Sequence, residues 1–214
     1  MLRLIFAAVL MLSPFAAFAQ DNSAAYRIEI ALDWSADPAE GHPADPHWSR
    51  LIAVAHSSRY ALFEDGSTAS SGLALVATNG RVSVLDAELA EARRRGRAGE
   101  PVVVPGLASG VGTFDLQLKL DTKLSHVAFV TMLAPSPDWF SGVSGVALYV
   151  DDAWLEQVRV PLWVWDAGAD SGPDFEGPNV DTQPRQSVRL LTHPAFLRPD
   201  GMRPIGTATF TRLP

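Results

Sequence analysis

The residues best suited to chemistry are three aspartates in two turn-forming segments. Asp138 lies in Pro-Ser-Pro-Asp-Trp-Phe at 135–140, and Asp166 and Asp170 lie in Trp-Asp-Ala-Gly-Ala-Asp-Ser-Gly at 165–172. The intervening Gly168 permits a tight chain reversal, so the carboxylates of Asp166 and Asp170 can converge on one point. Three carboxylates close together repel one another unless a positive charge neutralises them.

A hard divalent cation with oxygen ligands would supply that charge. Calcium takes roughly 6–8 oxygen ligands from carboxylates, backbone carbonyls and water. Zinc is a poor candidate, because the chain has no cysteine and neither segment holds a histidine. The spacing is also not that of an EF-hand loop. A second interpretation stays open, in which the aspartates only accept hydrogen bonds from backbone N–H groups in turns.

An antiparallel meander would bring the two segments together. Residues 127–133 are apolar on both faces, which predicts a central strand, and Asp151-Asp152 predicts a turn. Pro161 indicates an edge position or a bulge in the last strand. If the strands pair in order, Asp138 and Asp166 lie at the same end of the sheet. The predicted strands cover residues 127–133, 146–150 and 156–165, with a loop over 134–144.

The rest of the chain favours an all-β sandwich or barrel. Residues 26–33 and 113–121 alternate apolar and polar side chains, as half-buried strands do. Sixteen glycines and sixteen prolines separate many short apolar runs. One helix is predicted over 85–95, because acidic residues lie in its first turn, three arginines in its last turn and Gly96 after it.

The first 19 residues have the features of a secretory signal peptide. Arg3 provides the positive charge, an apolar run follows, and Ala17-Phe18-Ala19 forms a cleavage site. We therefore expect a single mature domain over residues 20–214, secreted or periplasmic, with no membrane span after cleavage. Loss of Arg3 would change the formal charge from −7 to −8. An acidic chain is not expected to bind nucleic acid.

Other catalytic patterns are weak. A metal or acid–base site among His42, His47 and His56 matches no known ligand spacing, so packed or hydrogen-bonded histidines are the preferred interpretation. The chain has no G-x-S-x-G elbow. Trp139 and Trp165 flank the aspartates and could be ligand platforms, although anchoring of the loops in the core is favoured.

The two aspartate segments, with Pro178-Asn179 and Thr182-Gln183-Pro184, resemble the signature of the spondin N-type domain, the adhesive domain of F-spondin and mindin. Upstream runs agree with this, including Pro46-His47-Trp48-Ser49 and Ala69-Ser70-Ser71-Gly72. The resemblance covers nearly all of residues 20–214. It implies an antiparallel C2-like β-sandwich with a calcium site, and it matches the family's calcium-binding aspartates to Asp138, Asp166 and Asp170.

The sequence departs from the animal pattern in two respects. The cysteines of animal members are missing, and Tyr149 occupies a position where one is expected. Some relatives add a carboxylate near the position that Lys119 takes here, which leaves Asp115 or Asp121 as substitute ligands. The fourth protein ligand is therefore open.

The leading hypothesis is an exported, non-enzymatic, calcium-binding domain that mediates adhesion or recognition through an unidentified surface or matrix protein or glycan. The alternative is an exported, metal-assisted hydrolase acting on a polysaccharide or an ester. A carboxylate pair can hydrolyse glycosides, but a carboxylate bound to a cation is a poor general acid because the cation lowers its pKa. A third hypothesis makes calcium purely structural, with the partner bound elsewhere.

Overall fold

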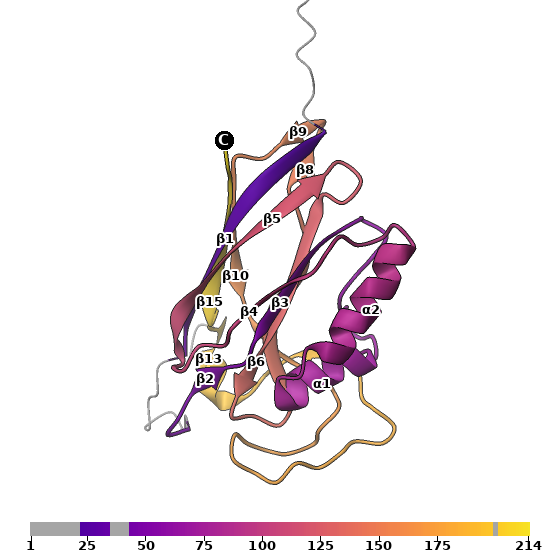
Figure 1. Ribbon diagram of the computed structural model, residues 1–214. Coiled ribbons are helices and arrows are strands. Elements are labelled where there is room, and N and C mark those ends of the chain that lie inside the picture. The colour runs from indigo at the N-terminus through magenta and orange to yellow at the C-terminus, as the bar shows by residue number, and fades with distance from the viewer. Residues whose placement is uncertain (1–21, 35–42, 199–200) are drawn as a thin grey trace, which may run out of the picture.

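Two antiparallel sheets pack face to face, and two helices cover the outer face of the larger sheet (Figure 1). The computed structural model describes residues 22–34, 43–198 and 201–214. The smaller sheet has four strands in the order β10-β15-β1-β5. The larger sheet has the order β12-β11-β7-β6-β3-β4, and β2 also pairs with β6. The predicted all-β sandwich is therefore confirmed.

The strands of the smaller sheet are β1 (Ser23–Asp33), β5 (Val111–Asp121), β10 (Gln157–Leu162) and β15 (Gly206–Arg212). The strands of the larger sheet are β2 (His47–Trp48), β3 (Leu51–His56), β4 (Val102–Val104), β6 (His126–Ala134), β7 (Trp139–Ala147), β11 (Val164–Asp166) and β12 (Arg189–Leu190). The remaining elements are α1 (Ser71–Asn79), α2 (Ser83–Arg94), the hairpins β8 (Tyr149–Val150) with β9 (Ala153–Trp154) and β13 (Leu197–Arg198) with β14 (Gly201–Met202), and the 3-10 turn η2 (Pro194–Phe196).

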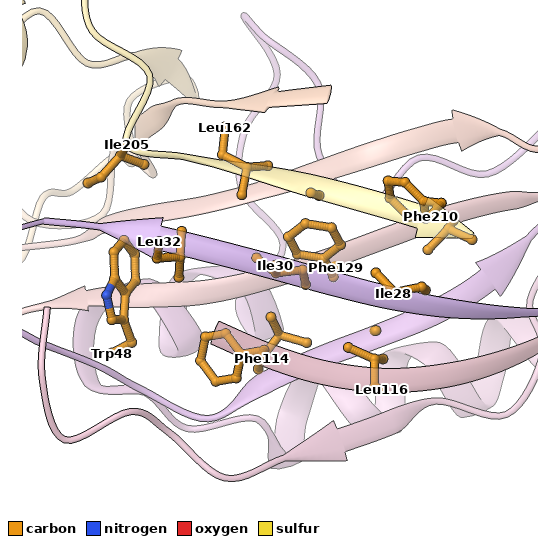
Figure 2. Packing of buried hydrophobic residues seen from close by; sticks show 14 of the residues in the cluster. Ile28, Ile30, Leu32, Trp48, Phe114, Leu116, Phe129, Leu162, Ile205 and Phe210 are labelled. Atoms are coloured by element: carbon orange, nitrogen blue, oxygen red, sulfur yellow. The ribbon is translucent and has the colours of Figure 1, made fainter. Parts of the chain in front are cut away.

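The space between the sheets holds the main core. The alternation predicted for residues 26–33 and 113–121 is confirmed, because the apolar side chains of β1 and β5 are buried and the polar ones face outward. Figure 2 shows Ile28, Ile30, Phe114 and Phe210 around Phe129, which β6 contributes from the larger sheet. Phe129 is fully buried.

A second core lies between the larger sheet and the helices. The central strands β3 and β6 are buried on both faces, as the apolar run at 127–133 predicted, because alternate residues enter the two cores. The predicted helix is present as α2, where Leu85, Leu89 and Ala92 are buried. Its last-turn arginines are exposed and form ion pairs with Glu91 and Glu100.

Helix α1 was not predicted. Its sequence is apolar on several sides, and a short apolar run does not distinguish a helix from a buried strand. The side chain of Ser70 accepts a hydrogen bond from the N–H of Leu73 and caps the helix. A Cβ on Gly72 would lie 2.5 Å from the Cα of Leu85, so this glycine allows close contact of the two helices.

Two predicted boundaries were wrong. The expected loop over 134–144 is shorter, because β7 begins at Trp139 and continues the pairing with β6. The expected single strand over 156–165 is divided between the two sheets, because β10 pairs with β15 and β11 pairs with β7. Pro161 does lie in an edge strand, as predicted.

The predicted signal peptide, residues 1–19, lies outside the described residues. In the described ranges, we find no helix of the length and apolar character that crossing a bilayer requires.

Candidate functional site

The two aspartate segments meet at one end of the larger sheet. Asp138 is the last residue of the turn between β6 and β7, and Asp166 is the last residue of β11. In the β7–β11 pair, Asp166 lies opposite Trp139, the residue that follows Asp138. The shared position of the two segments is therefore confirmed, although β7 and the short β11 bring them together in place of the predicted strands over 146–150 and 156–165.

Asp138 is the most deeply buried of the three aspartates, with none of its surface exposed. Its Oδ2 accepts hydrogen bonds from the backbone N–H groups of Ala169 at 2.6 Å and Asp170 at 3.0 Å. Its Oδ1 is buried and has no hydrogen-bond partner among the residues that the structure describes. An unpaired buried oxygen of a carboxylate is energetically costly, and a cation would satisfy it.

The electrostatics of Asp138 agree with this unpaired oxygen. Burial is the main cause that raises its pKa, to about 6, and the carboxylates of Asp166 and Asp170 raise it as well. The hydrogen bonds from Ala169 and Asp170 act in the opposite direction, because they stabilise the ionised form. At neutral pH the site therefore holds a negative charge that its surroundings compensate only in part.

Asp166 is held by a tight turn and an ion pair. Its Oδ1 accepts a hydrogen bond from the N–H of Gly168 at 2.7 Å. Its Oδ2 accepts a hydrogen bond from Nη2 of Arg189 at 2.9 Å. Gly168 has φ +68°, and a Cβ there would lie 2.4 Å from the carbonyl oxygen of Gln186. The tight reversal expected at Gly168 is confirmed, and a glycine is required there.

Asp170 organises the long loop that follows β11. Its Oδ1 accepts hydrogen bonds from the N–H groups of Gly172 and Val180, both at 2.8 Å. Its backbone also forms an isolated bridge with Asp181. All three aspartates thus accept turn or loop N–H groups, as the second interpretation of the sequence expected. Accepting backbone N–H groups leaves Oδ1 of Asp138 without a partner among the described residues, so turn formation alone does not explain the aspartate cluster.

A cavity of about 350 Å³ opens beside the aspartates. Asp166 and Asp170 line it on the side of β11, and Arg189 and His193 contribute from later segments. Trp139 also lines it, although only 3% of its surface is exposed. The cluster therefore has an opening wide enough for an ion and water, although the buried Asp138 does not itself line it.

The donor set suits a hard cation, but the side chains are not arranged around a common point. Within residues 22–34, 43–198 and 201–214, no group of three or more His, Cys, Asp or Glu side chains could hold a metal ion as it stands. The unpaired Oδ1 of Asp138 and the only partly compensated negative charge fit a cation. Binding would require the carboxylates to reorient, and Asp166 would share its charge between the ion and Arg189.

The tryptophans beside the cluster are anchors. Trp139 packs against Phe175 and His193, with ring centroids 5.0 and 4.9 Å apart. Trp165 packs edge-on against Phe63 at 5.3 Å. These contacts hold the two loops on the sandwich, so the core-anchoring interpretation of both residues is the one that the packing supports.

The other candidate residues have different environments. Asp115 pairs with Arg27 on the exposed face of the smaller sheet, and Asp121 accepts N–H groups of its own turn. His42 lies outside the described residues. His47 contacts the carbonyl oxygen of Asp45, while His56 is buried in the larger sheet. The two described histidines of this group are hydrogen-bonded, and His56 is also buried, as the preferred interpretation of the sequence expected.

Arg189 is the residue of this site that the sequence did not indicate. It belongs to β12, and the β11–β12 register places it directly opposite Asp166. A sequence separation of 23 residues through an irregular loop hides this relationship. Charge complementarity between Arg189 and the aspartates was the only signal present, and it is shared by every arginine of the chain.

Comparison with known proteins identifies related chains. A family model described as Spondin_N matches residues 24–200. Spondin-2 of Homo sapiens is 35% identical over 176 residues, which cover 78% of this chain and 53% of that protein. Spondin-1 of Gallus gallus is 34% identical over 201 residues, which cover 84% of this chain and 24% of that protein. The chain thus spans about half the length of Spondin-2 and about a quarter of Spondin-1.

Proposed function

Because this chain belongs to the spondin N-type domain family (Spondin_N), we propose that it is an exported, non-catalytic module for adhesion or recognition. Its partner would be a protein or glycan of a cell surface or matrix. Calcium bound by Asp138, Asp166 and Asp170 would shape the end of the sandwich that carries the long loop of residues 167–188. The family likeness supports the adhesive role, and the chemistry of the aspartate cluster supports the ion.

The observation that carries the calcium proposal is the unpaired Oδ1 of Asp138. This oxygen is buried, belongs to a carboxylate and faces no donor among the described residues. Asp166 and Asp170 add like charges nearby. Calcium accepts carboxylate, carbonyl and water oxygens in flexible geometry, so it tolerates carboxylates that also accept backbone N–H groups.

The ion would act by neutralising charge and joining loops. Asp138 comes from the β6–β7 turn, whereas Asp166 and Asp170 flank the start of the long loop. When bound, calcium would supply a positive charge between these segments. The chain's own hydrogen bonds from Ala169 and Asp170 to Asp138 already hold the segments together. A bound ion would therefore strengthen an existing connection.

The experiment is a comparison of melting temperatures in calcium and in chelator. A ligand at about a hundredfold excess over its Kd stabilises the native state by about 2.7 kcal/mol. We expect calcium to raise the Tm of the wild-type protein, and the double variant Asp138→Asn with Asp166→Asn to lose that rise. Asp115→Asn with Asp121→Asn is a matched control, because it removes two carboxylates elsewhere.

A wild-type Tm that is equal in calcium and in chelator would refute the calcium proposal. Adhesion has its own test, in which the protein is applied to immobilised glycans and matrix proteins with and without calcium. Binding to none of them would contradict the adhesive role.

The hydrolase alternative finds less support. Asp138 is the carboxyl with a raised pKa, which suits a general acid, but it has no exposed surface and both hydrogen bonds to Oδ2 come from the backbone. A general acid must reach the atom that it protonates. Turnover of a polysaccharide or ester substrate that Asp166→Asn abolishes would overturn the non-catalytic proposal.

A further inference from the structure

Two histidines at the opposite end of β6 from the Asp138 turn form a pair on the larger sheet. His56 is the last residue of β3 and His126 is the first residue of β6, and the β3–β6 register places them directly opposite each other. Side chains at opposite positions of an antiparallel pair lie on the same face. Their ring centroids are 5.7 Å apart.

One nitrogen of this pair is an unpaired acceptor. Only 1% of the surface of His56 is exposed. Its Nδ1 lies 2.9 Å from the carbonyl oxygen of Ser57, so Nδ1 carries the proton and Nε2 carries the lone pair. Nε2 is buried and has no hydrogen-bond partner in the described part of the chain. Burial lowers the pKa of His56, whereas hydrogen bonding with the backbone of Ser57, Ser144 and Tyr60 acts in the opposite direction.

Gly145 of β7 lies beside the edges of both rings. A Cβ built on Gly145 would lie 3.5 Å from Cε1 and 3.9 Å from Nε2 of His56, and 3.9 Å from Cδ2 of His126. The space that a side chain at position 145 would take is therefore flanked by the edges of both rings. Gly145 is exposed, so solvent and small ions reach it. The β6–β7 pairing is shifted by a bulge nearby, between Val127 and Phe129.

We propose that His56 and His126 form a binding site for a divalent transition-metal ion that prefers imidazole, with Cu²⁺ bound more tightly than Ni²⁺ or Zn²⁺. Nε2 of His56 is the first ligand and His126 the second, and water completes the coordination at the open side. The bond from Nδ1 of His56 to a backbone carbonyl is the arrangement that commonly orients histidine ligands of metals. Calcium is excluded here because it selects oxygen ligands.

The sharpest test is Gly145→Ala. Contacts of 3.5 Å and longer are ordinary van der Waals distances, and Gly145 does not adopt a positive φ, so alanine fits without strain. Its methyl group would take up the space against the edges of both imidazoles. Untagged protein saturated with calcium is titrated with Cu²⁺ at fixed pH by calorimetry, and the nitrogen ligands are counted by electron paramagnetic resonance.

We expect one Cu²⁺ per chain with two nitrogen ligands in the wild-type protein. Gly145→Ala and His126→Gln should each weaken binding by about tenfold or more, and His126→Gln should remove one nitrogen ligand. His47→Gln, which removes a histidine elsewhere, should bind as the wild type does. The proposal would be overturned if the wild-type protein did not bind Cu²⁺, or if either Gly145→Ala or His126→Gln bound Cu²⁺ with unchanged affinity. Loss of Cu²⁺ binding in His47→Gln would also overturn it.

Discussion

The backbone N–H of Ala169 donates a 2.6 Å hydrogen bond to Oδ2 of Asp138, although 31 residues separate the two. This bond joins the β6–β7 turn to the start of the long loop after β11. It uses one oxygen of Asp138 and leaves the other buried without a partner among the described residues. Several measurable consequences depend on this arrangement.

The stability of the calcium-free protein should depend on the titration of Asp138. Its pKa is raised from 3.8 to about 6, so the folded state favours the protonated carboxyl. The stabilisation is fully present below pH 3.8 and is lost as the pH rises through about 6. The free energy of unfolding of the wild type, measured relative to that of Asp138→Asn, should fall by up to roughly 3 kcal/mol between pH 4 and pH 7.

Urea unfolding of both proteins in EDTA across this pH range measures the difference, and other titrating groups cancel in it. Saturating calcium should recover the loss above about pH 6, because the ion and the proton compete for Asp138. Parallel stability curves for the two proteins would show that Asp138 titrates normally.

Arg189→Gln should tighten calcium binding severalfold. The guanidinium of Arg189 holds a positive charge beside Asp166. Removing this guanidinium lowers the electrostatic repulsion between the protein and a calcium ion that binds Asp166. The substitution should lower the free energy of unfolding of the calcium-free protein by no more than about 1 kcal/mol, because the Arg189 side chain is 61% exposed and solvent screens the ion pair. Calorimetric titration with calcium measures the affinity.

Arg27→Gln serves as the control for Arg189→Gln. It breaks an exposed ion pair with Asp115 on the smaller sheet and should leave calcium affinity unchanged. Equal affinities in all three proteins would show that the ion does not bind near Asp166.

Gly168→Ala should destabilise the protein strongly. The alanine would adopt a positive φ of 68° and its Cβ would lie 2.4 Å from a backbone oxygen of Gln186. We expect a loss of about 3 kcal/mol or more, from backbone strain and displacement of the β11 loop. Urea unfolding gives the value.

Gly66→Ala separates the two causes in Gly168→Ala. Gly66 has φ +82° with nothing within 4 Å of its Cβ position, so only backbone strain of about 1 kcal/mol is expected. Similar losses in both variants would mean that the contact with Gln186 relaxes freely.

Phe129→Ala should cost about 3–5 kcal/mol, because it removes a fully buried ring from the space between the two sheets (Figure 2). Val103→Ala is the control, since this side chain of β4 is 41% exposed and should contribute little. Denaturant unfolding measures both variants. A loss below about 1 kcal/mol for Phe129→Ala would show that the sheets repack around the vacancy.

Local patterns in the sequence determined the sandwich and most of its strands. Alternation in 26–33 and 113–121 defined β1 and β5, because each has one face in the core and one in water. The doubly apolar run at 127–133 defined the central strand β6, because its two faces enter the two cores. Helix α1 was missed because a short, evenly apolar run carries no period that separates a helix from a buried strand.

The aspartate cluster was predictable in part. The turn-forming residues around Asp138 and Asp166, with the meander order, were enough to place both at one end of the sheet. Only the tertiary structure decided that Asp138 is buried with one oxygen unpaired, that Arg189 lies opposite Asp166, and that His56 faces His126. These relationships depend on strand register and on the packing of distant segments, which periodicity and spacing in a single sequence do not encode.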